Sequence, residues 1–305
     1  MATVQPVPLS PVSKFELKHI LVTTDFSDCS RNALTQAAAI ARLHSADLLL
    51  LHVVPIEPLI QHALEPPTWE YQDIIHQAQS QMASAETLEL LAGIPHQVAV
   101  EHGPFEQIMS RFIQEREISL LVVGTHGRTG FKKLLLGSVA EKMFRLAECP
   151  VMTVGPCESP MLVSHGRFQS VLFATDFSPG SMHALTYAIG FARESQARLT
   201  LMHVVEEGSV AALYLHERLL ADARRRLDEI VPAHAGVPLP PDTEIASGYP
   251  VDEILRVADK KQADLIVMGV HKSGGLGART SSHLPWTIAQ MVVGHAKCPV
   301  LTVRG

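Results

Sequence analysis

Residues 24–54 read TDFSDCSRNALTQAAAIARLHSADLLLLHVV, and residues 175–205 read TDFSPGSMHALTYAIGFARESQARLTLMHVV. At a constant offset of 151 residues, 17 of these 31 positions are identical, which is far more than shared composition produces. The similarity returns near the end of each half, where SLLVVGTH (119–126) matches DLIVMGVH (264–271) and ECPVMTV (148–154) matches KCPVLTV (297–303). The chain is therefore two copies of one ancestral domain.

Each copy alternates apolar runs with helical patterns. In the first copy HILVTT (19–24) and ADLLLLHVV (46–54) predict buried strands, and apolar residues recur at helical spacing over 29–44. The remaining pattern predicts helices over 68–92, 104–116 and from 138, and strands over 96–101, 118–124 and 151–154. Because parallel strands need helical crossovers, we expect two tandem doubly wound α/β domains, each Rossmann-like with a five-stranded parallel sheet in the order 3-2-1-4-5.

Composition limits both the domain organisation and the function. The stretch GPCESPMLVSHGRF (155–168) has the Gly, Pro and Ser of a linker, so we expect domains over 1–155 and 168–305 joined by 156–167. The net charge of −6 and the scarcity of aromatic residues argue against binding of nucleic acid or of an anionic membrane. Four widely spaced cysteines, prolines near the N-terminus and the lack of a long apolar run predict a cytoplasmic protein.

Three features of the first copy converge on one edge of the predicted sheet. Asp25 follows the first strand, Val53 ends the second, and the loop GTHGRTGFKKLLLGS (124–138) follows the fourth. Ligands of such folds bind at the carboxyl ends of strands, where the strand order reverses. Glycines allow close backbone approach to an anion, and Gly137-Ser138 opens a helix whose free N–H groups favour phosphate. The loop is therefore predicted to bind a polyphosphate.

Each of these residues also has an ordinary structural interpretation. Asp25 could serve only as a helix cap, and Gly124 and Gly127 could serve a plain turn. Of Arg128, Lys132 and Lys133, we expect one to contact phosphate and the others to be solvated. The sixteen histidines show no metal-ligand spacing, so we expect packed or loop histidines and no metal site built by the protein. Cys149 and Cys298 are expected to be buried rather than redox-active.

The TTDFS start, the LHVV strand end and the pattern Gly-x2-Gly-x9-Gly-Ser resemble the universal stress protein family in its tandem form, over residues 15–155 and 168–304. The long-spaced glycine pattern with an upstream Asp resembles the ATP-binding branch of that family. The resemblance implies ATP with Mg²⁺ on its phosphates as ligand. It implies contacts to ribose, adenine and phosphates from Thr24, Asp25, Val53, Gly124, His126, Gly127, Arg128, Gly137, Ser138 and Val139.

The second copy departs from this pattern. Asp176, Val204 and Gly269 are kept, but Lys272 stands where Gly127 does, and Trp286-Thr287 aligns with Gly137-Ser138. A Trp at a helix start obstructs phosphate, and Pro285 removes one N–H donor. We therefore expect one ATP site per chain. The alternative is that Gly274, Gly275 and Gly277 build a pocket for another ligand.

The function expected from these features is that of an ATP-binding stress-response protein, a nucleotide-dependent sensor or adaptor with slow hydrolysis at most. Asp25 is the only acid that the motifs bring to the pocket, so no catalytic residue is predicted. A nucleotide-free interaction scaffold and an ATP-hydrolysing enzyme remain as alternatives. In the family, strands equivalent to 151–154 and 300–303 pair, so we expect the two halves to pair within the chain, and a homodimer is a weaker expectation.

Overall fold

The structure is a computed structural model that describes residues 15–54, 68–125, 138–156, 166–206, 210–231, 235–270 and 285–305. In the first half the strands are β1 (His19–Thr23), β2 (Asp47–Val54), β3 (His96–His102), β4 (Leu120–Gly124) and β5 (Val151–Val154). The helices described there are α1 (Asp28–His44), α3 (Thr68–Met82), α4 (Ala85–Leu91), α5 (Phe105–Glu115) and α6 (Ser138–Leu146).

The second half repeats this order of elements. Its strands are β6 (Ser170–Ala174), β7 (Arg198–Val205), β8 (Asp242–Ser247), β9 (Leu265–Val270) and β10 (Val300–Arg304). The helices described there are α8 (Pro179–Ser195), α9 (Val210–Ile230), α10 (Pro250–Lys260) and α11 (Pro285–His295).

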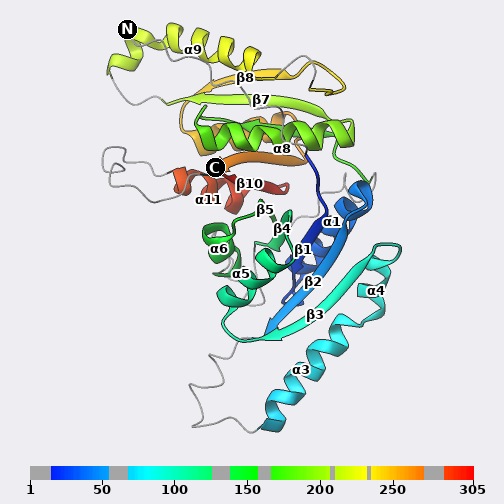
Figure 1. The fold of residues 1–305 in the computed structure, drawn as a ribbon. Helices are drawn as coiled ribbons and strands as arrows, with labels where there is room; N and C mark the ends of the chain where they lie inside the picture. Colours follow the sequence, from blue (N-terminus) through cyan, green and yellow to red (C-terminus); the bar gives the residue numbers. More distant parts are fainter. Residues whose placement is uncertain are drawn as a thin grey trace.

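The strands that the structure describes form one continuous ten-stranded sheet, in the order β3-β2-β1-β4-β5-β10-β9-β6-β7-β8. Within each half the pairs are parallel and follow the predicted order, with β1 or β6 in the middle. At the centre β5 and β10 run antiparallel, with Leu301 opposite Met152, and Figure 1 shows the two strands side by side where the halves meet. The α/β fold with a mainly parallel sheet is thus confirmed.

Two layers of helices cover the sheet because successive strand residues point to opposite faces. On one face Ile20 and Val22 pack with α1, α4 and α8 in a single apolar core that runs through both halves. On the other face Leu21 packs with α5 and α6, and Leu172 packs with α10 and α11, as two separate cores. The halves are therefore joined through one face of the sheet and remain distinct on the other.

The contact between β5 and β10 is reciprocal. The Thr153 hydroxyl donates a hydrogen bond to the Val300 carbonyl (3.1 Å), and the Thr302 hydroxyl donates one to the Val151 carbonyl (3.2 Å). Both threonines are buried, and each stands at the equivalent place in its own half. The two halves therefore meet through the same surface of each copy, as subunits of a symmetric dimer do.

The predicted helix over 68–92 is wrong in one respect. The structure divides this range into α3 and α4, separated by Ala83 and Ser84. The Ser84 hydroxyl accepts a hydrogen bond from the Thr87 backbone N–H (3.3 Å) and so caps a new helix. Serine is favoured at the N-cap of a helix over its interior, and the apolar pattern of 68–92 does not show such a cap.

An aromatic cluster joins α1 to α8 beside the shared core. The Phe15 ring packs edge-on against the rings of His44, Tyr187 and Phe191, with centroids 5.1 to 5.8 Å apart. The buried Nε2 of His44 has no hydrogen-bond partner among the described residues. Burial in this cluster lowers the pKa of His44, and Glu194 opposes that shift only in part.

Protonation of His44 should destabilise the contact between the halves. Because the folded state lowers the pKa of His44, the neutral form is favoured and the loss of stability develops as the pH falls through about 6.5, the pKa of an exposed histidine. We expect His44→Phe to reduce the loss of unfolding free energy between pH 7.5 and pH 5. Urea titrations at several pH values measure this, with His76→Phe, a change at an exposed position of α3, as control. An unchanged pH dependence in His44→Phe would refute the assignment.

Candidate functional site

The described candidate residues lie at the carboxyl ends of three neighbouring strands. Thr24 and Asp25 directly follow β1, Val53 is the penultimate residue of β2, and Gly124 is the last residue of β4. Because β1 lies between β2 and β4, this edge is where the chain reverses the direction in which it adds strands. Doubly wound sheets bind their ligands at such a point.

Asp25 shapes the turn that leads from β1 into α1. Its Oδ1 accepts hydrogen bonds from the Ser27 backbone N–H (3.0 Å) and the Ser27 hydroxyl (2.6 Å). Phe26 between them has a φ of 65°, in the left-handed region that a bulky residue rarely adopts. The cap of α1 is Ser27, whose hydroxyl accepts from the Ser30 N–H (3.2 Å). Asp25 is therefore the residue that closes the turn, and the capping role considered for it belongs to Ser27.

Thr24 and His52 tie this turn to β2. The Thr24 hydroxyl accepts a hydrogen bond from the Phe26 N–H (3.0 Å) and shares another with the Ser30 hydroxyl (3.1 Å). The Thr24 carbonyl lies 2.7 Å from Nδ1 of His52, which must donate because a carbonyl only accepts. The His52 ring packs on the Phe26 ring at 4.5 Å. His52 is thus a packed histidine, as predicted, but it also holds the turn, which the sequence interpretation missed.

Gly124 has a packing role that is independent of any ligand. A Cβ at this position would lie 2.9 Å from the carbonyl carbon of Cys29 and 3.0 Å from the Ser30 nitrogen. The first turn of α1 therefore lies directly on the end of β4. This close approach brings the Asp25 turn next to the start of the loop 124–138.

The remaining candidates are only partly described. His126, Gly127, Arg128 and Gly137 lie outside the described residues. Ser138 and Val139 are the first two residues of α6, and only their backbone is described. Since the first N–H groups of a helix have no partner within it, the start of α6 is the kind of position at which proteins bind anions.

The second half has the same turn at the same place. Asp176 Oδ1 accepts from the Ser178 N–H (3.0 Å) and hydroxyl (2.5 Å), and Phe177 has a φ of 60°. His203 again bonds to a threonine carbonyl, that of Thr175, at 2.8 Å. The turn alone therefore does not distinguish the halves. The difference lies after β4 and β9, where α11 begins with Pro285 and α6 begins with Ser138.

One positive charge is close to the turn of the second half. The Arg226 guanidinium lies over the Phe177 ring, 3.9 Å from its centroid. Burial is the main cause that lowers the pKa of His203, and Arg226 contributes to the same shift. The hydrogen bond to the Thr175 carbonyl opposes this shift in pKa, and the net effect favours the neutral form of His203.

The structure also bears on the metal and cysteine predictions. No group of three or more His, Cys, Asp or Glu side chains that could hold a metal ion occurs in the described ranges. Cys149 is buried, and burial raises its pKa to about 12; Cys298 is half-buried, and burial likewise raises its pKa to about 12. Both thiols therefore stay protonated and unreactive at neutral pH. None of the described helices is long and apolar enough to cross a membrane.

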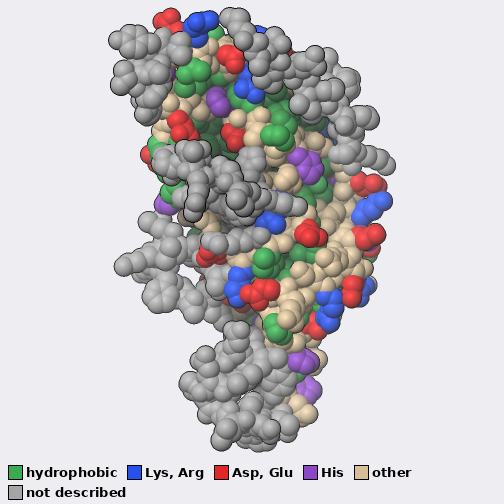
Figure 2. Space-filling model, turned by 60° about the vertical axis from the view of Figure 1, so that its left-hand side comes forward, with side chains coloured by type: hydrophobic (Ala, Val, Ile, Leu, Met, Phe, Trp, Pro, Cys, Tyr) green, Lys and Arg blue, Asp and Glu red, His purple; other side chains and the backbone are tan. Residues whose placement is uncertain are grey.

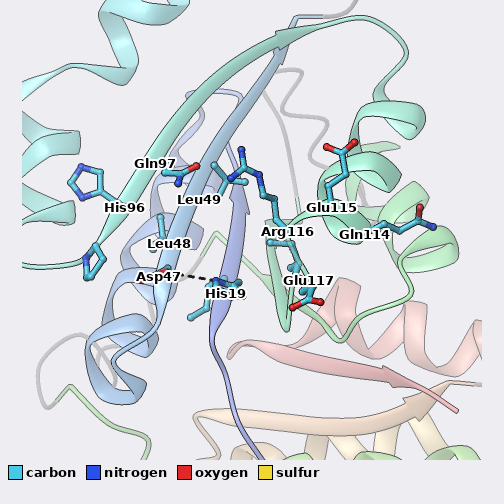
Figure 3. A pocket seen from close by; sticks show the side chains of 13 residues that line it. His19, Asp47, Leu48, Leu49, His96, Gln97, Gln114, Glu115, Arg116 and Glu117 are labelled. Carbon is cyan, nitrogen blue, oxygen red and sulfur yellow. Dashed lines mark ion pairs between the residues drawn. The ribbon is translucent and has the colours of Figure 1, made fainter.

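A pocket lies at the opposite edge of the first half, at the amino ends of β1, β2 and β3 (Figure 3). It shares no residue with the candidate site.

Comparisons with known proteins agree with the duplicated architecture. The model of the universal stress protein family matches residues 16–155 and 167–304. A universal stress protein of Mycolicibacterium smegmatis is 27% identical over 308 residues, covering 93% of this chain and 96% of that protein. One of Thermus aquaticus is 39% identical over 144 residues, covering 45% of this chain and 99% of that protein. The crystal structure of a universal stress protein from Archaeoglobus fulgidus has the same fold, with a TM-score of 0.66, 21% identity, and coverage of 95% and 99%.

Proposed function

Since the chain belongs to the universal stress protein family, we propose that its first half binds ATP with Mg²⁺. We further propose that the protein acts as a nucleotide-dependent sensor or adaptor in a stress response. One observation carries the proposal. The glycine series of residues 124–138 begins at Gly124 and ends at Ser138, and these two residues are the end of β4 and the start of α6.

The residues present suit a nucleotide. The start of α6 offers backbone N–H groups to phosphate, and the glycines of the loop permit close approach. The Asp25 turn and Val53 stand on neighbouring strands, where they would meet the ribose and adenine. We assign Thr24, Asp25, Val53, Gly124, His126, Gly127, Arg128, Gly137, Ser138 and Val139 to this site. Bound ATP would bring Mg²⁺ on its phosphate oxygens, so no metal site of the protein is needed.

The second half is proposed to bind no ATP. It shares the Asp turn but lacks the spaced glycines, and α11 begins with a residue that has no backbone N–H. The proposed stoichiometry is one ATP per chain.

We further propose that the protein is not an enzyme beyond slow hydrolysis of ATP. Hydrolysis needs a base or equivalent group that positions water near the γ-phosphate. Asp25 is the only acid that the sequence motifs bring to the proposed site. Its Oδ1 already accepts two hydrogen bonds from Ser27. No residue is therefore assigned a catalytic role.

The proposed partners and domain organisation rest on the surface charge and on the contact between β5 and β10. Acidic and basic side chains are intermingled on the coloured part of the face in Figure 2. Together with the net charge of −6, this supports a partner other than nucleic acid or a membrane surface. The β5–β10 contact supports a functional unit made of two domains, 1–155 and 168–305, joined by the linker 156–167. A cytoplasmic location and a homodimer of whole chains complete the proposal.

Two measurements on the purified chain test this function. Mass spectrometry of the denatured protein should find co-purified ATP, and phosphate release with added ATP and Mg²⁺ should be far below the typical enzymatic range of 1–1000 per second. Rapid turnover would instead identify an ATP-hydrolysing enzyme. No bound nucleotide at millimolar ATP would leave an interaction scaffold, and either result overturns the proposal.

A further inference from the structure

The pocket at the amino edge of the first half differs from the equivalent place in the second half. This amino-edge pocket has a volume of about 510 Å³, within the range of small-molecule sites. Its lining includes apolar residues, among them Leu48 and Ile118, which are buried. Polar side chains from the strand starts and from the residues after α5 surround it; they include His19, Asp47, His96, Gln97, Arg116 and Glu117.

In the second half a lysine occupies the corresponding position and is paired. Lys261 follows α10 as Arg116 follows α5. Its Nζ lies 3.2 Å from Asp242 Oδ2 and 3.0 Å from Glu244 Oε1, both on β8. Glu244 also receives Lys260, at 3.1 Å. The two lysines therefore form ion pairs with two carboxylates of β8.

The first half lacks these two carboxylates. Sheet register makes Gln97 the equivalent of Asp242, because they pair with Leu49 and Thr200, which are related by the 151-residue offset. By the same register Ala99 is the equivalent of Glu244. The Arg116 guanidinium accordingly has no ion pair or side-chain hydrogen bond with any residue that the structure describes.

The orientation of these side chains leaves the guanidinium facing the pocket. Figure 3 shows Arg116 extending across the pocket toward Gln97 and Leu49, while Glu117 and Gln114 point away from its guanidinium. Asp47 is engaged by His19, with Nδ1 and Oδ2 3.7 Å apart. The Arg116 guanidinium is therefore a donor directed at the space beside Gln97.

We propose that the amino-edge pocket binds a small monocarboxylate with an apolar tail, whose carboxylate takes the place that Asp242 and Glu244 fill in the second half. Arg116 receives the carboxylate, and the apolar residues of the lining receive the tail. The second half has two cations here, Lys260 and Lys261, whereas the first half has Glu115 in place of Lys260 and so only Arg116. We therefore propose a ligand with one negative charge. Asp47, Glu115 and Glu117 add negative charge around the pocket, which disfavours a polyanion such as a nucleotide more strongly than an anion of single charge.

Titration of the whole chain with 4-methylpentanoate, followed by amide NMR shifts, tests the proposal. We expect saturable shifts in β3 and after α5, and none at the equivalent places of β8 and α10. The neutral analogue 4-methylpentanamide should bind at least about tenfold more weakly, since a charge-assisted hydrogen bond to the ligand is lost. Equal binding of acid and amide, or no saturable shift at tens of millimolar, would overturn the proposal.

Two variants locate the site. Arg116→Gln removes the cation and should weaken binding at least about tenfold. Gln97→Asp keeps the cation but supplies the carboxylate that β8 supplies, so it should block binding while the fold is retained. Arg111→Gln, which removes an exposed arginine within α5, is the matched control and should leave binding unchanged. Unweakened binding in both Arg116→Gln and Gln97→Asp would refute the assignment, and ATP binding should be unaffected in each.

Discussion

Replacing Gly269 by alanine should lower the free energy of unfolding by about 3 kcal/mol, the upper part of the range for overpacked sites. A Cβ at Gly269 would overlap the Ser181 Cα and would lie 2.5 Å from the Ser181 nitrogen. These are backbone atoms of the first turn of α8, which the Ser178 cap holds in place. The helix would have to move away from β9, and the shared core would lose contacts with it.

Two other glycines calibrate this result. Gly155→Ala places its Cβ 3.8 Å from the nearest atom, the Ala296 carbonyl oxygen, and should change stability little. Gly124→Ala, with a closest distance of 2.9 Å, should fall between the two. Urea denaturation measures all three. If Gly269→Ala stays within about 0.5 kcal/mol of the unmodified chain, as neutral surface changes do, the close packing of strand end on helix start is wrong.

Gly127→Val should weaken ATP binding at least about a hundredfold. The proposed role of Gly127 is to let backbone N–H groups reach the phosphates, and a branched side chain prevents that approach. Losing two charge-assisted hydrogen bonds accounts for a factor of this size. Titration with a fluorescent ATP analogue in the presence of Mg²⁺ measures the change.

The control for Gly127→Val is Lys272→Val, its counterpart in the second half. Both positions lie outside the described residues, and we expect neither variant to alter the urea midpoint greatly. Lys272→Val should leave ATP affinity unchanged, because the second half is proposed to bind none. Unchanged affinity in Gly127→Val would remove the phosphate role assigned to the loop.

Most of the fold could be predicted because the sequence repeats itself. The apolar run of residues 46–54 and the helical spacing over 29–44 recur 151 residues later, and the structure has β2, α1, β7 and α8 there. The break between α3 and α4 was missed because Ser84 caps a helix without interrupting the apolar pattern. The aromatic contact of Phe15 with α8 was also beyond reach, since such long-range packing has no local signal.

The candidate site could be predicted in position more than in detail. Asp25, Val53 and Gly124 come to one edge because the carboxyl ends of parallel strands do so in any doubly wound sheet. The hydrogen bonds that make Ser27 the cap, and His52 the support of Thr24, depend on the left-handed Phe26, which no residue preference indicated. Arg116 has no ion pair among the described residues, and no local sequence signal indicates this, because it depends on the register of β3 and β8.

The central claim is that the two halves share one fold but that only the first binds ATP. Equilibrium dialysis of the whole chain against ATP and Mg²⁺ tests this most directly. We predict one ATP bound per chain at saturation, and none in Gly127→Val. Two ATP per chain, or none in the unmodified protein, would contradict the account.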